Sequence, residues 1–114
     1  STLSNGNTGL LVNMAKNGGL PWDCVLSSDT FGHFKPDPEM YLGAADRLDV
    51  RPDELMMVAS HKHDLRAAAK NGLKTAFIQR PHEYGRNNNP DLAPEAEFTY
   101  NASSFVDLAD QLGC

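Results

Sequence analysis

The chain has 114 residues, a length that suits one small domain. Hydrophobic residues make up 40% and charged residues 22%, as in ordinary globular proteins. The net charge of −5, with no dense basic stripe, argues against a nucleic-acid partner. The longest apolar run, 55–59, is too short to cross a membrane, and no signal pattern opens the chain, so we expect a cytoplasmic protein without a membrane partner.

Short apolar runs alternate with helical patterns, which predicts an α/β fold with parallel strands. The first half of the chain predicts, in order, a strand ending at Ser4, a helix at about 9–17 capped by Asn7 or Thr8, a strand at 24–27, a loop at 29–35 and a helix at 37–48. This last helix has Asp37 as its N-cap, Pro38 at its first position and Glu39 in its first turn. Its expected buried face comprises Met40, Leu42, Ala44, Ala45 and Leu48.

The second half predicts, in order, a turn at 52–54, a strand at 55–59, a helix opened by Asp64 and ended by Asn71-Gly72, a strand at 75–78, a loop at 79–97, a strand at 98–100 and a helix from Ser103 or Ser104 to Leu112. The unbroken apolar character of 55–59 indicates a strand covered on both faces. Cys24 is expected to be a buried free thiol, because one pair with Cys114 at the chain end is not a disulfide framework.

Three polar clusters each lie just past a short apolar run. They are Ser4-Asn5, Lys35-Pro36-Asp37-Pro38 and Ser60-His61-Lys62-His63-Asp64. Ligands of open parallel sheets bind outside the carboxyl ends of the strands, so the three clusters are expected to converge on one pocket, as in an enzyme. No Asp-x-Asp cluster precedes the first of them, so the nucleophile that such a site needs is absent from these residues.

These clusters and their neighbours resemble, in order, the second, third and fourth motifs of the haloacid dehalogenase superfamily. The segments that carry the resemblance are Thr2–Gly6, Phe34–Tyr41, Met57–His61, Asp64–Ala68 and Gly72–Ile78. Within the superfamily the chain is most similar to the type II 2-haloacid dehalogenases. The resemblance implies a Rossmann-like, three-layer α/β/α core that is incomplete, because the nucleophile strand and the cap domain are absent. Residues 1–114 are then the C-terminal portion of a single core domain.

The resemblance also implies how the sheet is interrupted. In the family the nucleophile strand lies between the strand ending at Ser4 and the strand ending at Ala59. Two half-sheets with unpaired inner edges are therefore expected, since buried backbone groups need hydrogen-bond partners. A missing N-terminal segment, another chain or homo-oligomeric pairing is expected to complete the sheet.

Site roles follow from the same resemblance. It implies catalytic roles for Lys35, Asp64 and Ser4, and binding of substrate or halide by Asn5, Tyr41, Ser60 and His61. The residues alone leave alternatives open. Ser4-Asn5 also suits a turn. Lys35 can be a solvated surface lysine, Tyr41 a half-buried aromatic residue and Asp64 a helix N-cap.

The implied reaction is hydrolysis of small 2-haloalkanoic acids through an aspartyl ester, on a small anionic substrate, with this chain alone inactive. Ser60 stands where phosphatase members place a magnesium-binding acid, so no cofactor is expected; magnesium belongs to the alternative of a phosphatase. His61 departs from the amide of typical dehalogenases, and His63 from an aromatic residue. His61-x-His63 lacks a third ligand at convincing spacing, so no metal site is expected. A non-catalytic interaction module is the other alternative.

Overall fold

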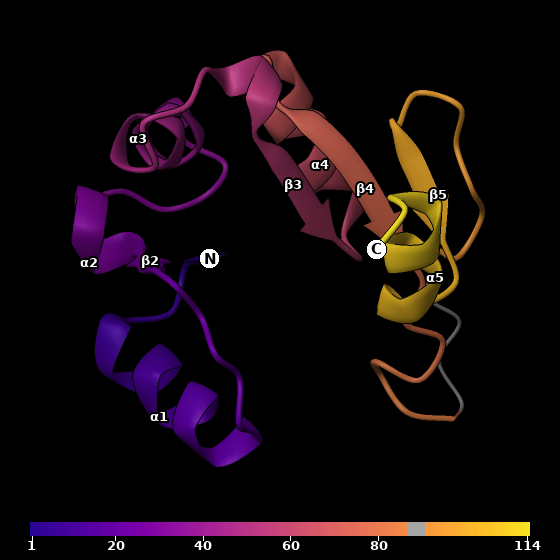
Figure 1. Ribbon diagram of the computed structural model, residues 1–114, viewed down its shortest axis with the longest axis horizontal. Helices are drawn as coiled ribbons and strands as arrows, with labels where there is room; N and C mark the ends of the chain where they lie inside the picture. Colours follow the sequence, from indigo (N-terminus) through magenta and orange to yellow (C-terminus); the bar gives the residue numbers. More distant parts are fainter. Residues whose placement is uncertain (87–90) are drawn as a thin grey trace. The chain divides into compact units, whose positions relative to one another are not determined.

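The computed structural model describes residues 1–86 and 91–114 and divides into two compact units, Ser1–Pro52 and Asp53–Cys114 (Figure 1). Both units contain parallel strands connected by helices, which confirms the predicted α/β class. Within the described ranges, none of the helices has the length and apolar character needed to cross a membrane. The assignment of residues 1–114 to a single domain stays a prediction.

The sheet of the first unit has two short strands. β1 (Thr2–Ser4) and β2 (Val25–Ser27) pair in parallel, and helix α1 (Thr8–Gly18) connects them. The hydroxyl of Thr2 accepts a hydrogen bond from the backbone N–H of Leu26 at 3.0 Å and donates one to its carbonyl at 2.9 Å. The side chain thus reinforces a ladder of only three residue pairs. Both strands end at a serine, so the turns that follow them lie at the same edge.

Helix α1 begins and ends as its capping residues predict. The Oδ1 atom of Asn7 accepts a hydrogen bond from the N–H of Leu10 at 2.8 Å, which satisfies one of the free donors of the first turn. At the other end Gly19 has a φ of 63°, a left-handed conformation that a glycine adopts without strain.

The first unit contains one helix that the sequence analysis missed. Residues 29–35 were expected to form a loop, but α2 (Ser28–Phe31) occupies the beginning of this range. Ser27 and Thr30 form a capping box, in which the Thr30 hydroxyl accepts from the N–H of Ser27 at 3.1 Å. Two hydroxyl side chains therefore start this short helix without the acidic N-cap and apolar periodicity used to predict the others.

Helix α3 (Pro38–Arg47) starts where predicted, with Asp37 at the N-cap position, although the Asp37 carboxylate makes no capping bond. Its buried face differs in part from the prediction. Met40, Tyr41, Ala44 and Ala45 are buried, whereas Leu42 is 44% exposed. The expectation for Leu42 is therefore wrong, and Tyr41 takes its place on the inner face. Helix α2 packs against α3 at Gly43, where an added Cβ would lie 2.7 Å from the ring of Phe31.

The second unit is a three-layer α/β/α arrangement. After the short turn η1 (Pro52–Glu54), it contains β3 (Met56–Ala59), α4 (Lys62–Lys70), β4 (Lys74–Ile78), β5 (Tyr100–Ala102) and α5 (Phe105–Gln111). The strands are parallel in the order β3-β4-β5. Helix α4 packs on β3 and β4, and α5 packs on β5 and β4 (Figure 1).

Strand β4 is the centre of this unit, and its side chains alternate between the two helices. Ala76 and Ile78 cluster with Leu108 of α5. On the alternate positions, Phe77 is 1% exposed and lies 5.3 Å from the Lys62 ammonium of α4. Both faces of β4 are therefore covered. β3, for which the sequence predicted cover on both faces, is only partly buried except at Met57.

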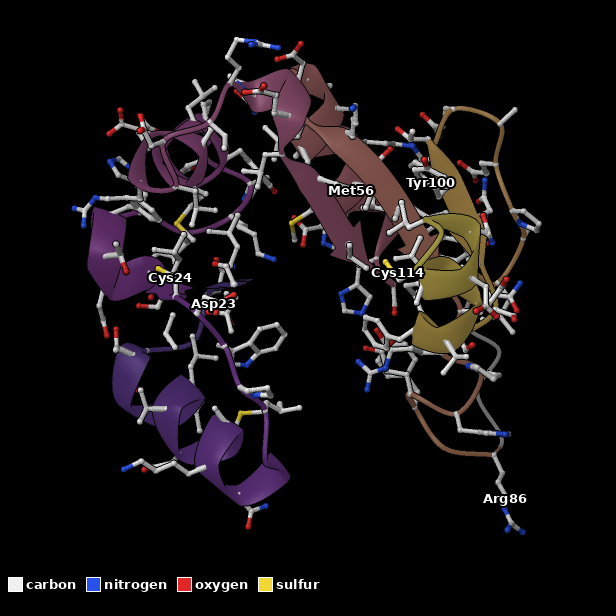
Figure 2. The ribbon with its side chains drawn as sticks, in the orientation of Figure 1. Asp23, Cys24, Met56, Arg86, Tyr100 and Cys114 are labelled. Atoms are coloured by element: carbon white, nitrogen blue, oxygen red, sulfur yellow. The ribbon has the colours of Figure 1, made fainter. Side chains whose placement is uncertain are left out.

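Several element boundaries differ from the predicted ones by one or two residues. β5 begins two residues later than expected, because Thr75 and Thr99 exchange hydrogen bonds between their hydroxyls and backbone N–H groups, at 3.1 and 3.3 Å, before the ladder starts. β2 begins after Cys24, a free and half-buried thiol rather than a buried one (Figure 2). The predicted loop at 79–97 contains no helix or strand at 79–86 and 91–97; residues 87–90 lie outside the described ranges.

The described strands form two separate sheets, β1-β2 and β3-β4-β5, as the expectation of two half-sheets requires. Within residues 1–86 and 91–114, β1 pairs only with β2, and β3 only with β4, so each has one edge without a strand neighbour. Completion of these edges by a further segment, another chain or a second copy stays a prediction.

Candidate active site

The side chain of Asn5 holds the backbone of Lys35. The Oδ1 atom of Asn5 accepts a hydrogen bond from the Lys35 N–H at 2.6 Å, and its Nδ2 atom donates to the Lys35 carbonyl at 3.1 Å. Asn5 follows β1, and Lys35 lies in the loop between α2 and α3, so the contact joins segments 30 residues apart. The structure thus brings these two predicted site residues together. Asn5 acts here on main chain, and its binding of substrate or halide stays a prediction.

Ser4 lies in the turn that carries Asn5. The Ser4 Oγ atom accepts a hydrogen bond from the N–H of Gly6 at 3.0 Å, which is the turn interaction that the sequence left open. Buried Ser28 also fixes this turn, by donating to the carbonyl of Asn5 at 3.1 Å. Sequence reasoning missed Ser28, because an isolated serine carries no signal for this role.

Tyr41 is fully buried, at 0% exposure, whereas the sequence offered a half-buried aromatic residue as the alternative to a site role. It lies one turn into α3 as predicted, beside the equally buried Met40. Substrate contact by its hydroxyl stays a prediction.

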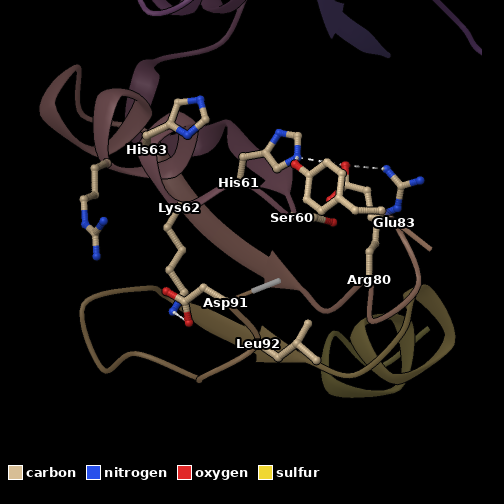
Figure 3. Close-up of a pocket in the computed structure, with 10 residues that line it drawn as sticks. Ser60, His61, Lys62, His63, Arg80, Glu83, Asp91 and Leu92 are labelled. Atoms are coloured by element: carbon tan, nitrogen blue, oxygen red, sulfur yellow. Dashed lines mark hydrogen bonds and ion pairs between the residues drawn. The ribbon is translucent and has the colours of Figure 1, made fainter. Parts of the chain in front are cut away.

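The second unit has a cavity of about 340 Å³ that contains two of the predicted binding residues, Ser60 and His61 (Figure 3). Ser60 follows β3 directly. The wall across from α4 comes from the segment after β4 and includes Arg80, Glu83 and Tyr84. The cavity therefore opens at the carboxyl ends of neighbouring parallel strands, where a ligand site is expected.

His61 is held by several side chains in this cavity. Its Nε2 atom lies 2.8 Å from Oε1 of Glu83 and 3.3 Å from the Tyr84 hydroxyl. The ring also stacks on His63, with centroids 5.7 Å apart and an interplanar angle of 7°. Arg80 lies 3.4 Å from the same oxygen of Glu83. No sequence pattern indicated a role for Glu83, because it lies in a segment without periodicity, 22 residues from His61.

Asp64 is buried, with 7% exposure, in the third position of α4. The prediction that Asp64 is the helix N-cap is wrong, since α4 starts at Lys62 and His61 occupies the N-cap position. A carboxylate in the first turn still interacts favourably with the helix dipole. Asp64 belongs to the second unit and Ser4 and Lys35 to the first, so convergence of the three side chains stays a prediction.

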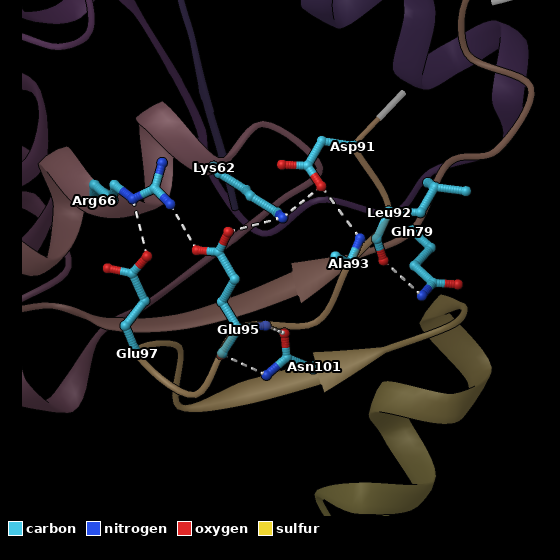
Figure 4. Close-up of polar contacts among 9 residues, drawn as sticks. All are labelled: Lys62, Arg66, Gln79, Asp91, Leu92, Ala93, Glu95, Glu97 and Asn101. Atoms are coloured by element: carbon cyan, nitrogen blue, oxygen red, sulfur yellow. Dashed lines mark hydrogen bonds and ion pairs between the residues drawn. The ribbon is translucent and has the colours of Figure 1, made fainter. Parts of the chain in front are cut away.

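A charged network ties α4 to the segment before β5 (Figure 4). The ammonium of Lys62 lies 2.7 Å from Asp91 and 3.0 Å from Glu95. Arg66 contacts Glu95 at 2.6 Å and Glu97 at 2.9 Å. Burial would lower the pKa of Lys62, but its hydrogen bonds to the two carboxylates outweigh this effect and raise that pKa. The Lys62 hydrogen bond lowers the pKa of Asp91, and hydrogen bonds with Glu97 and Lys62 lower the pKa of Glu95 to about 2.

These shifts predict that the network weakens in acid. A carboxyl whose pKa is lower in the folded state stabilises the fold above its unfolded pKa, and this contribution is lost as the pH falls through the folded value. For Glu95 the interval runs from about 4.5 down to about 2. In the complete protein, Glu95→Gln should flatten the fall in the free energy of unfolding below pH 5, measured by urea denaturation. Asp110→Asn, at an exposed acid, is the control; equal slopes in wild type and Glu95→Gln would contradict the prediction.

Three metal-ligating side chains lie close together at the start of α3, a group that the sequence analysis did not consider. They are His33, Asp37 and Glu39, whose ligand atoms all lie within 4.8 Å of one another. The Nδ1 atom of His33 lies 3.3 Å from Asp37 and 3.8 Å from Glu39, which is also the geometry of ion pairs around a protonated imidazole. Because both acids are exposed and the ion pairs account for the contacts, no metal is assigned here.

Comparison with known proteins establishes the family. The model of the family described as haloacid dehalogenase-like hydrolase matches residues 13–78, more than half of the chain. The chain belongs to this family of hydrolases. The match agrees with the parallel α/β fold and with the resemblance inferred from the motifs.

Individual relatives refine the comparison. The chain is 41% identical over 87 residues to (S)-2-haloacid dehalogenase 1 of Pseudomonas sp. (strain CBS-3), covering 72% of this chain and 38% of that protein. It is 37% identical over 57 residues to pyrophosphatase PpaX of Bacillus cereus (strain G9842), covering 50% and 26%. The crystal structure of the L-2-haloacid dehalogenase PA0810 superposes with a TM-score of 0.93 at 53% identity, over 97% of this chain and 48% of that one. The chain thus spans less than half the length of these haloacid dehalogenase relatives.

Proposed function

We propose that this chain is part of a hydrolase that removes the halogen from small 2-haloalkanoic acids through an aspartyl-ester intermediate. The observation that carries the proposal is the likeness to an L-2-haloacid dehalogenase over nearly the whole chain, at 53% identity. The two hydrogen bonds between the Asn5 amide and the Lys35 backbone support the proposal, because a catalytic ammonium group acts best from a backbone that is held in place.

In the proposed reaction a carboxylate attacks the carbon that bears the halogen, the halide leaves, and water hydrolyses the resulting ester. We place the attacking carboxylate in a part of the protein outside these 114 residues, since the relatives are about twice as long. Lys35 would neutralise that carboxylate and the substrate carboxylate, an attraction that strengthens where water is excluded. Ser4 would donate its hydroxyl hydrogen to an anionic oxygen or to the halide.

The remaining predicted residues fit the same proposal. Asp64 would orient Lys35 or the hydrolytic water. Tyr41, Ser60 and His61 would line the substrate or halide site. Two partners are implied: a small anionic substrate, and the segment, chain or second copy that pairs with the open edges of β1 and β3.

A phosphatase is the second candidate, and the likeness to a pyrophosphatase over half of the chain favours it. Ser60 argues against it, because a neutral hydroxyl is a poor ligand for Mg²⁺ compared with the carboxylate of phosphatase members. The third candidate, a non-catalytic interaction module, requires that the complete coding sequence lacks an Asp-x-Asp cluster.

The test uses the complete protein that contains this chain. We expect it to release chloride from 2-chloropropanoate, with the same rate when EDTA is present, as followed with a halide-sensitive electrode. Magnesium-dependent release of phosphate from pyrophosphate or a phosphomonoester, without chloride release, would replace the proposal by the phosphatase. If neither chloride nor phosphate is released, the non-catalytic interaction module is the remaining candidate.

A further inference from the structure

His61 and Glu83 meet because two neighbouring parallel strands end at the same edge of the sheet. His61 follows β3, Glu83 follows β4, and the two strands pair directly. Figure 3 shows the imidazole and the carboxylate facing each other among the residues that line the cavity. Nε2 of His61 lies 2.8 Å from Oε1 of Glu83. The Glu83 side chain is only 14% exposed, whereas that of His61 is 45% exposed. The carboxylate is thus shielded behind an imidazole that remains open to a ligand or to water.

The contact with Glu83 determines which nitrogen of His61 is free. A carboxylate can only accept a hydrogen bond, so Nε2 carries the hydrogen that it donates to Glu83. In the neutral imidazole Nδ1 then has the lone pair, and among residues 1–86 and 91–114 it has no hydrogen-bond partner. Stacking on His63 and the nearby Tyr84 hydroxyl further restrict the ring. The arrangement is a carboxylate–histidine pair with one nitrogen fixed and the other available for proton transfer.

We infer that His61 is a proton-transfer group of the proposed ester hydrolysis and that Glu83 is its positioning residue, an inference that rests on the proposed function. Nδ1 of His61 takes a proton from water while the water oxygen bonds to the ester carbonyl carbon. The acyl C–O bond then breaks, and the departing alkoxide of the 2-hydroxy acid takes the proton from Nδ1. The enzyme carboxyl group is regenerated and releases its proton to solvent.

The surroundings of the pair suit this role. Four other charged groups among the described residues line the same cavity: Arg80, which contacts Glu83 at 3.4 Å, and Lys62, Arg66 and Asp91. Lys62 and Asp91 neutralise each other at 2.7 Å. Glu83 therefore remains the only carboxylate among the described residues that contacts the imidazole.

Position 61 offers a sharp test, because the resemblance implies an amide there in typical dehalogenases. An amide binds substrate or halide by hydrogen bonds but cannot carry a proton. In the complete protein, His61→Asn should lower kcat for 2-chloropropanoate by about 10²-fold or more while KM changes little. Glu83→Ala should also lower kcat, because His61 loses the carboxylate that orients its ring. His82→Asn, an exposed histidine in the same segment as Glu83, is the matched control and should retain wild-type kcat.

Two further readouts separate proton transfer from a structural role. Added imidazole should partly restore kcat of His61→Ala and should have no effect on the wild type. Nitrogen-15 NMR of the histidine rings should find that the neutral ring of His61 carries its proton on Nε2 and not on Nδ1, with this preference lost in Glu83→Ala. Wild-type kcat in a folded His61→Asn variant, absence of imidazole rescue, or a proton on Nδ1 in the neutral ring of His61 would each overturn the inference.

The NMR result does not depend on turnover. Failure of the proposed dehalogenase function can therefore be distinguished from failure of the proposed role of His61 and Glu83. A wild-type protein that releases no chloride ends the proposed function and the role of the pair in it, whatever the tautomer. Chloride release with an active His61→Asn variant retains the proposed function and removes only the role of His61.

Discussion

Replacing Lys35 by methionine in the complete protein is expected to lower kcat/KM for 2-chloropropanoate by about 10²–10³-fold. Methionine keeps most of the length of the side chain but removes the charge that offsets two carboxylates in the proposed reaction. The Asn5 side chain binds the backbone N–H and carbonyl of residue 35 and not its ammonium group, so the loop should keep its place in the variant. The loss would therefore report the charge and not the loop conformation.

The measurement compares initial rates of chloride release and checks folding by circular dichroism. Lys70→Met, at an exposed lysine in the last turn of α4, is the matched control and should keep the wild-type value. A folded Lys35→Met variant within threefold of the wild type would show that Lys35 is a solvated surface residue, the alternative that the sequence left open.

Replacing Phe77 by alanine is expected to lower the free energy of unfolding by about 3–5 kcal/mol. Phe77 is 1% exposed in the central strand β4, and its ring lies 6.0 Å from that of Phe98. The Lys62 ammonium lies 5.3 Å from the ring centroid, so truncation also removes a favourable cation–aromatic contact. Helix α4 packs directly on this face of the strand, so truncation leaves a cavity in the core of the second unit.

Urea denaturation of the complete protein tests this expectation. Phe105→Ala is the matched control, because Phe105 lies on α5 at 69% exposure and its truncation should change the free energy by less than about 0.5 kcal/mol. A loss below about 1 kcal/mol in Phe77→Ala would contradict the prediction. It would mean that the core around β4 relaxes to fill the space left by the ring.

The strands and most helices were predictable because their signals are local. Asn7, the Pro38–Glu39 start and Gly19 each act within one turn of their own helix, and the structure confirms all three. Helix α2 was not predicted, because its capping box pairs Ser27 with Thr30, two hydroxyl residues that equally suit a loop.

The site was predictable only in part, since its contacts join distant segments. The predicted convergence of all three polar clusters stays a prediction. The structure joins the first two through Asn5 and Lys35, and no pattern indicated that the Asn5 amide would bind backbone. Glu83 stands in a segment with no periodicity and approaches His61 only because β3 and β4 are neighbours. Chain topology, and not residue type, selects such a partner.

The two-point contact of Asn5 has a consequence for how this protein can change. The amide binds the main-chain N–H and carbonyl that every amino acid except proline possesses, so it would hold the backbone of any other residue at position 35 equally well. Scaffold and reactivity are thus encoded at separate positions. Mutation at 35 can explore new chemistry on an intact loop, while mutation at 5 would disturb whatever chemistry that loop presents.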